Sequence, residues 1–305
     1  MKKTIEVNPE FASEIVLCVP YAYYLHKNDL LECVITSKGM KPFYYFCNNV
    51  KESFISRSLD NLVALKDVPN KWIHNSEAGG KRNGVIDYNE WIVPPYREYY
   101  KNNLFDDLKP YIVVNNIYNV EPGPYGYKPY RYFDIKNLYD MFVSLTEKGY
   151  NVIYKRPLNN EFVIDQSEQV TLTSNLKITA DVENLGTITD FDLIKYFNKV
   201  YNLNDLQKKY NLEYNELQLK LFSESEGFVT VNGGGGILCA YFDKPVIKYV
   251  NKGKELRPMY LEYPDSYINK LSSAKVYPVF DNFEEWPKNG GRNYTKLIST
   301  IESVF

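Results

Sequence analysis

The sequence lacks the long apolar runs that place a chain in a membrane. No segment approaches the roughly 20 uninterrupted apolar residues that span a bilayer. The basic start, "MKK", is followed by acidic residues and not by the clean apolar core of a secretory signal. We therefore expect no membrane span and a cytoplasmic location.

The sequence also lacks an excess of charge of either sign. Lys and Arg number 36 against 38 Asp and Glu, a formal net charge of -2. Without a basic stripe, a nucleic-acid partner is not expected. The four cysteines are widely spaced and form no C-x-x-C pair, which excludes the common zinc and redox motifs. We expect neither a bound metal nor another cofactor.

Glycine, in contrast, is concentrated at one place. "VNGGGG" covers Val231–Gly236, after a strand-like run and before a short apolar, helix-like segment. Backbone N–H groups at a helix start attract anions, and glycines let a phosphate approach them closely. The run matches neither the dinucleotide fingerprint nor the Walker loop. Phosphate binding is the favoured interpretation, and a tight packing turn is the alternative.

Strand-like and helix-like segments alternate along the chain, which is typical of parallel α/β sheets. Near the N-terminus we predict a strand at 14–20, a helix at 29–39 and a strand at 41–49. Further on, we predict strands at 109–116, 150–156 and 176–182, and helices at 134–149, 189–203, 214–225 and 294–305. A domain boundary is placed between 107 and 108.

The stretch "NGGGG…FDKPVIKY", Asn232–Tyr249, resembles the nucleotide-sugar half of GT-B glycosyltransferases, a fold that also serves non-hydrolysing sugar epimerases. The resemblance implies an α/β fold of two Rossmann-like α/β domains facing a central cleft. Residues 1–107 would form the acceptor side, and 108–305 would bind the nucleotide-sugar and carry a terminal helix. The E-x-seven-E signature of one branch is absent, so no ribose ligand is assigned.

The resemblance also implies a substrate and a reaction. The protein would be a hexosyl- or pentosyltransferase that moves a sugar from a nucleoside-diphosphate sugar to a hydroxyl of a glycan acceptor. Inversion at the sugar carbon, without a metal, is expected. A sugar-nucleotide epimerase of the same fold is one alternative. A non-catalytic protein that binds nucleotides or carbohydrates is the other.

Two strand ends and the Pro/Gly-rich loop Glu121–Tyr127, interpreted as a lid or acceptor-side loop or else a surface loop, would converge on the glycine run and its donor diphosphate. The expected ligands are Asn232, Gly233, Gly234, Gly235 and Gly236, together with Asn115, Lys155 and Arg156. A cation here could neutralise the leaving group, and Arg suits bidentate phosphate contact. A solvated strand end is the alternative interpretation of Lys155 and Arg156.

An inverting transfer needs a base for the acceptor hydroxyl. We nominate His26, in the expected loop after the first strand, with Asp29 beside it. Asp29 could instead cap a helix in a capping box with Glu32. His74 could contact an acceptor. The "DFD" at Asp190–Asp192 is interpreted as acidic residues at a helix start and not as a metal site.

The first domain would hold the acceptor. Trp91, Tyr96 and Arg97 lie in the aromatic stretch "NEWIVPPYREYY". Aromatic faces can pack against the C–H surfaces of a sugar, because they pair a broad apolar face with a polar edge. Ordinary core and surface aromatics of a tyrosine-rich chain are the alternative.

Overall fold

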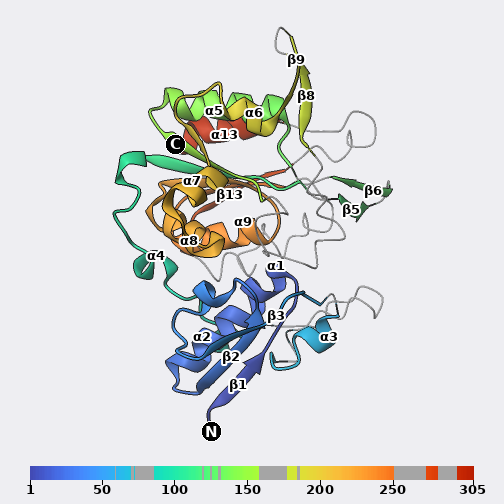
Figure 1. Cartoon of the computed structure of the whole chain (residues 1–305), viewed down its shortest axis with the longest axis vertical. Coiled ribbons are helices and arrows are strands. Elements are labelled where there is room, and N and C mark those ends of the chain that lie inside the picture. The colour runs from blue at the N-terminus through green and yellow to red at the C-terminus, as the bar shows by residue number, and fades with distance from the viewer. Residues whose placement is uncertain are drawn as a thin grey trace. The chain divides into compact units, whose positions relative to one another are not determined.

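The computed structural model describes residues 1–58, 60–69, 72, 86–118, 120–123, 126–129, 132–157, 177–183, 186–250, 273–280 and 294–305. The chain divides into two compact units, the first built mainly from Met1–Pro95 and the second mainly from Tyr96 onward. The second unit thus begins earlier than the predicted boundary at 107/108. Figure 1 colours the chain from the N-terminus to the C-terminus.

The first unit contains a three-stranded parallel sheet in the order β1-β2-β3. Its elements are β1 (Lys3–Glu6), α1 (Phe11–Ser13), the π-helical segment η1 (Glu14–Cys18), α2 (Val19–Lys27), β2 (Leu31–Ser37), η2 (Lys41–Tyr44), β3 (Val50–Phe54), α3 (Asn61–Ala64) and η4 (Tyr88–Glu90). The strand–helix–strand pattern expected here is present, but it begins one strand earlier.

Three predictions in this unit are wrong. The run at 14–20 is helical and forms η1 and the first residues of α2, where the fixed φ of Pro20 is compatible with a helix. The segment at 29–39 is mainly β2, whose Val34, Ile35 and Thr36 are β-branched and suit a strand. The segment at 41–49 begins as the 3₁₀ turn η2, and the strand follows it. Short apolar runs do not distinguish helix from strand by periodicity.

The second unit contains a six-stranded parallel sheet and two small antiparallel pairs, β5-β6 and β8-β9. Its elements are α4 (Tyr96–Tyr99), η5 (Asp106–Leu108), β4 (Tyr111–Asn115), β5 (Val120–Gly123), β6 (Gly126–Pro129), α5 (Ile135–Glu147), β7 (Asn151–Lys155), β8 (Thr179–Val182), β9 (Gly186–Thr189), α6 (Asp190–Ile194), β10 (Val200–Asn202), α7 (Leu203–Tyr210), α8 (Tyr214–Glu224), β11 (Gly227–Val231), α9 (Gly234–Cys239), η7 (Ala240–Phe242), β12 (Val246–Val250), β13 (Val276–Phe280) and α13 (Tyr294–Val304).

Most predictions for this unit are confirmed. Strands β4, β7 and β8 and helices α5, α8 and α13 lie within their predicted ranges. Strands β4, β11 and β12 are buried along their whole length, as expected of parallel strands covered on both faces. The exception is 189–203, which forms α6 and then β10 rather than one helix. Its Thr189 cap and Asp192 close a capping box that starts α6.

The large sheet has the strand order β10-β7-β4-β11-β12-β13. Numbered along the chain, this is the doubly wound order 3-2-1-4-5-6, which reverses direction between β4 and β11. Helices α5 and α13 cover one face, and α7, α8 and α9 lie on the other (Figure 1). In such sheets, ligands bind beyond the carboxyl ends of the strands, at the reversal point. The fold therefore indicates where a site belongs.

Candidate functional site

A row of polar side chains crosses four neighbouring strands at the reversal point. Lys155 of β7 is paired in register with Asn115 of β4, Asn115 with Thr230 of β11, and Thr230 with Lys248 of β12. Residues paired in register point to the same face of a sheet. All four are buried, in strands that are otherwise almost wholly apolar. Two cations thus flank two neutral polar groups in one row.

Hydrogen bonds fix one side of this row. The Lys155 ammonium donates to Asn115 Oδ1 at 2.7 Å, and Asn115 Nδ2 donates to Thr230 Oγ1 at 2.8 Å. The Thr230 hydroxyl in turn donates to the Val231 carbonyl at 2.8 Å. Lys155 therefore determines which way the Asn115 amide faces, because an ammonium can only donate.

The glycine run begins α9 directly over this row. Gly233 has a φ of 128° and precedes the first residue of the helix, Gly234. A Cβ added to Gly235 would lie 3.0 Å from Asn115 Nδ2, and one added to Gly236 would lie 2.6 Å from the Val231 carbonyl oxygen. Close packing against the Val231 backbone therefore requires glycine at 236, whereas at 235 the neighbouring atoms belong to the Asn115 side chain. The packing interpretation of the glycine run thus applies at Gly236, and anion binding stays a prediction.

Several of the predicted donor residues lie close together. Asn115 and Lys155 end the neighbouring strands β4 and β7, and Asn232 and the glycines connect β11 to α9 and form its first turn. Thr230 and Lys248 were not predicted. Their only sequence signal is a single polar residue inside each of two apolar strands, "FVTV" and "VIKYV". Burial raises the pKa of the Cys239 thiol on α9 to about 12, and the nearby charges of Lys155 and Lys248 oppose this rise. Lys155 and Lys248 thus both lie close enough to Cys239 to influence its pKa.

Arg156 has a different environment from the one predicted. Its guanidinium donates to Asp190 from Nε at 2.5 Å and from Nη2 at 2.9 Å, and it lies over the Phe191 ring, 4.3 Å from the centroid. Tyr154 also donates to Asp190, at 2.7 Å. Burial, and then the Asp190 charge, raise the pKa of Tyr154 well above its usual value. Arg156 is thus already neutralised inside the protein.

The same network reaches the start of the loop after β4. Asn116 donates to the Tyr154 hydroxyl at 3.0 Å and to the Phe133 carbonyl at 3.1 Å. Its Oδ1 accepts from the backbone N–H groups of Phe133 and Ile117. Asn116 therefore ties the two ends of segment 117–133 together, next to the polar row.

In the first unit, the predicted base residues lie at the end of α2. His26 is exposed in the last turn of that helix, rather than in a loop after a strand, and its ring stacks on Tyr23 and lies tilted against Phe46. Asp29 follows with a φ of 55° and pairs with Lys2 at 2.7 Å. That hydrogen bond lowers the pKa of Asp29. The capping-box prediction is wrong, because β2 and not a helix follows Asp29.

A buried carboxylate in the same unit was not predicted. Glu14, in the π-helical segment, is fully buried and accepts hydrogen bonds from Arg57, Thr36 and, at 2.9 Å, the Tyr44 hydroxyl. The Arg57 guanidinium also donates to the Pro9 carbonyl at 2.6 Å. The cluster joins the segment after β1 to strand β2, and it has no signal in the sequence beyond one acidic residue before an apolar run.

The predicted acceptor residues have different environments within their own units. Trp91 is buried in the first unit and donates from Nε1 to the Val16 carbonyl at 2.6 Å. Tyr96 is buried in the second unit, stacked near Tyr241 and Phe242, whereas Arg97 is exposed. Both aromatic rings are thus core residues. His74 lies outside the described residues.

Comparison with solved structures identifies the same fold elsewhere. ADP-heptose LPS heptosyltransferase II of E. coli superposes with a TM-score of 0.54 at 9% identity, over 100% of this chain and 98% of that one. This similarity, with the parallel sheets, confirms the predicted GT-B-like α/β fold class.

Weaker similarities are found to a glycosyltransferase family 9 structure from Veillonella parvula (TM-score 0.47, 8% identity, 99% of this chain and 95% of that one) and to the UDP-GlcNAc 2-epimerase of Methanocaldococcus jannaschii (0.44, 12%, 100% and 92%). No protein-family model and no curated protein sequence matches the chain. Within the described ranges, no helix has the length and apolar character needed to cross a membrane.

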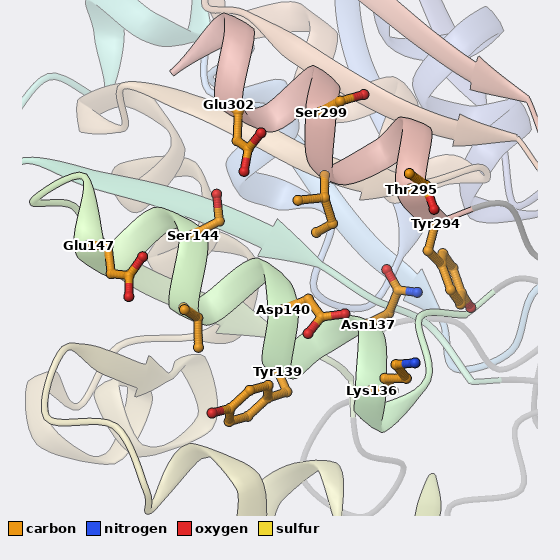
Figure 2. Close-up of a pocket in the computed structure, with 12 residues that line it drawn as sticks. Lys136, Asn137, Tyr139, Asp140, Ser144, Glu147, Tyr294, Thr295, Ser299 and Glu302 are labelled. Carbon is orange, nitrogen blue, oxygen red and sulfur yellow. The ribbon is translucent and has the colours of Figure 1, made fainter.

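A separate groove of about 650 Å³ lies on the opposite helical layer of the second unit. Helices α5 and α13 form its two sides, and Figure 2 shows side chains of both helices projecting into the space between them. It contains none of the residues predicted to bind a donor or an acceptor. Its lining is mostly polar and acidic.

Proposed function

We propose that this chain is a nucleotide-sugar-dependent glycosyltransferase whose donor diphosphate binds at the reversal point of the second unit's sheet. The observation that carries the proposal is the buried row Lys155–Asn115–Thr230–Lys248 beneath the glycines of α9. Two ammonium groups in a region of low dielectric favour a ligand with concentrated negative charge. The GT-B-like fold supports the same assignment.

The residues have separate tasks in this proposal. The glycines let the diphosphate approach backbone N–H groups, and Lys155 and Lys248 supply positive charge as the leaving group forms. Such charge accelerates transfer because it is worth more in the transition state than in the bound donor. Arg156 acts indirectly, since its ion pair with Asp190 holds the end of β7.

The test is calorimetry and thermal shift with UDP, GDP, ADP and CMP and their common sugars, with and without EDTA. We expect one nucleoside diphosphate to stabilise the protein selectively and with no effect of EDTA. Lys155→Met and Lys248→Met should each weaken that diphosphate at least about tenfold and barely affect the nucleoside alone. A folded wild-type protein that binds no nucleotide would refute the proposal.

Turnover then distinguishes the enzyme classes. A transferase consumes the donor only in proportion to acceptor glycosylated, whereas an epimerase converts the sugar nucleotide alone. We further propose inversion without a metal, with His26 as the base. His26→Ala should leave donor affinity unchanged and lower turnover at least about tenfold. A variant as fast as wild type removes His26 from this role.

A further inference from the structure

The groove between α5 and α13 contains buried polar groups that the fold does not use. Asn137 is 1% exposed and lines the groove, yet neither its Oδ1 nor its Nδ2 has a hydrogen-bond partner in the described part of the chain. The same is true of Ser144 Oγ, about two turns further along α5. Buried amides and hydroxyls are normally paired, by protein or by a bound group.

The charge of the groove is predominantly negative. Asp140 and Glu147 of α5 and Glu302 of α13 line it, against the single lysine Lys136 in the lining. No ion pair involves these three carboxylates within the described residues. The ammonium of Lys148 lies nearby, where it donates to the Glu302 backbone carbonyl at 2.6 Å. Carboxylates still outnumber the ammonium groups around the groove.

Apolar side chains lie between the acidic groups at the two ends of the groove. Val143 stands between Asp140 and Glu147 on α5, and Ile298 stands one turn before Glu302 on α13. Asp140 and Glu147 are about 10 Å apart along the helix axis, since each residue advances an α-helix by 1.5 Å. In Figure 2, Asp140 lies near the Asn137 end, and Glu147 and Glu302 lie at the other. The sequence of groups along the groove is acidic, apolar, acidic.

We propose that this groove binds a linear aliphatic polyamine. One ammonium group is held by Asp140 and the Oδ1 atom of Asn137, and another by Glu147, Glu302 and Ser144. The methylene chain between them packs on Val143 and Ile298. The oxygens of Asn137 and Ser144 accept N–H bonds from the ammonium groups, which gives these buried atoms the partners they lack inside the chain.

The geometry favours an extended cation over a single divalent ion. Ca²⁺ and Mg²⁺ take oxygen ligands at about 2.0–2.6 Å, so Asp140 and Glu147 cannot share one ion across about two helical turns. A divalent ion would also leave Val143 and Ile298 without a role. An amine chain uses both the charged ends and the apolar middle.

The experiment is calorimetry of the whole chain with spermidine, putrescine and MgCl₂ at constant ionic strength. We expect spermidine to bind more tightly than the shorter putrescine, and Mg²⁺ to bind weakly. Asp140→Asn and Glu302→Gln should each lower spermidine affinity at least about tenfold. Glu183→Gln, which removes an exposed carboxylate of the same unit outside the groove, is the matched control.

Two further results would overturn the proposal. If Asp140→Asn and Glu183→Gln lower affinity equally, the amines only screen the surface charge. If a lysine-rich peptide displaces spermidine and binds more tightly than any amine, the groove is a protein-docking site instead. Asn137→Leu, checked by circular dichroism to be folded, must also lose spermidine binding. None of these readouts depends on nucleotide binding, so this proposal and the proposed function succeed or fail separately.

Discussion

The Asp190 carboxylate receives two hydrogen bonds from the Arg156 guanidinium, at 2.5 Å from Nε and 2.9 Å from Nη2. The two side chains are almost entirely buried, and they join the end of β7 to the start of α6. A buried pair of this kind is costly to break, because the remaining charge has no counter-ion.

Asp190→Asn should therefore destabilise the protein by about 3–5 kcal/mol, measured by urea unfolding. The double variant Arg156→Met/Asp190→Leu should recover most of this loss, since it removes both buried charges. A single variant that loses less than about 1 kcal/mol would show that the pair is not desolvated in solution.

Gly235 and Gly236 should differ in their response to alanine. The Cβ of Gly236→Ala meets a backbone oxygen at 2.6 Å and should destabilise the folded protein. The Cβ of Gly235→Ala meets the Asn115 side chain at 3.0 Å, which can turn away, so the fold should survive with weaker diphosphate binding. Thermal melts and nucleotide titrations measure the two effects. Equal stability of the two variants would contradict the packing described here.

Glu14 should be essential for the stability of the first unit. Glu14→Ala leaves the Arg57 charge buried without its carboxylate and should cost about 3–5 kcal/mol. Glu6→Ala, which removes the exposed ion pair with Lys66, should cost at most about 1 kcal/mol and serves as the control. Chemical denaturation followed by tryptophan fluorescence gives both values. If the two variants lose similar free energies of unfolding, the buried Glu14–Arg57 pair contributes no more to stability than the exposed Glu6–Lys66 pair.

Low pH should remove a small contribution that the N-terminal cap of α6 makes to the free energy of unfolding. Hydrogen bonds from Lys195 and then Thr189 lower the pKa of Asp192 from 3.8 to about 2. Because the folded pKa is depressed, the stabilisation is present above pH 3.8 and is lost as the pH falls through about 2. Asp192 is 40% exposed, so solvent screening keeps this contribution below about 1 kcal/mol.

The stability difference between wild type and Asp192→Asn should accordingly be largest near neutral pH and fall to its smallest value below about pH 2. Unfolding free energies of both proteins across this range measure it, and titration of all other carboxylates cancels in the difference. If the difference in unfolding free energy stays constant with pH, the charge of Asp192 does not contribute to the stability of the cap.

Asn137→Leu should maintain or raise the free energy of unfolding, by up to about 1 kcal/mol, while it abolishes polyamine binding. Leucine has nearly the same shape and leaves no buried amide unsatisfied. Asn116→Leu is the contrasting control, because the Asn116 amide bonds Phe133 and Tyr154, and its loss should destabilise the protein. A large destabilisation by Asn137→Leu would indicate that its amide is paired within the chain.

The sequence predicted the second unit far better than the first. Strands such as 109–116 are apolar throughout, and helices such as 134–149 have a clear apolar face, so both patterns are unambiguous. The segment at 14–20 is equally apolar but short, and its helical state depends on what it packs against. Pro20 is compatible with the first turn of a helix, and that position could not be recognised from the apolar pattern alone.

The sequence by itself determined the parallel α/β fold class and the glycine run at the start of α9, because both follow from local composition and periodicity. Tertiary structure decided which charged side chains lie at the proposed donor site and which are paired elsewhere. Lys155 and Arg156 are adjacent in sequence, yet strand alternation turns them to opposite faces, one beneath the glycines and the other onto Asp190. Register also aligned Lys248 with Thr230. Such pairings join distant segments, and no local pattern encodes them.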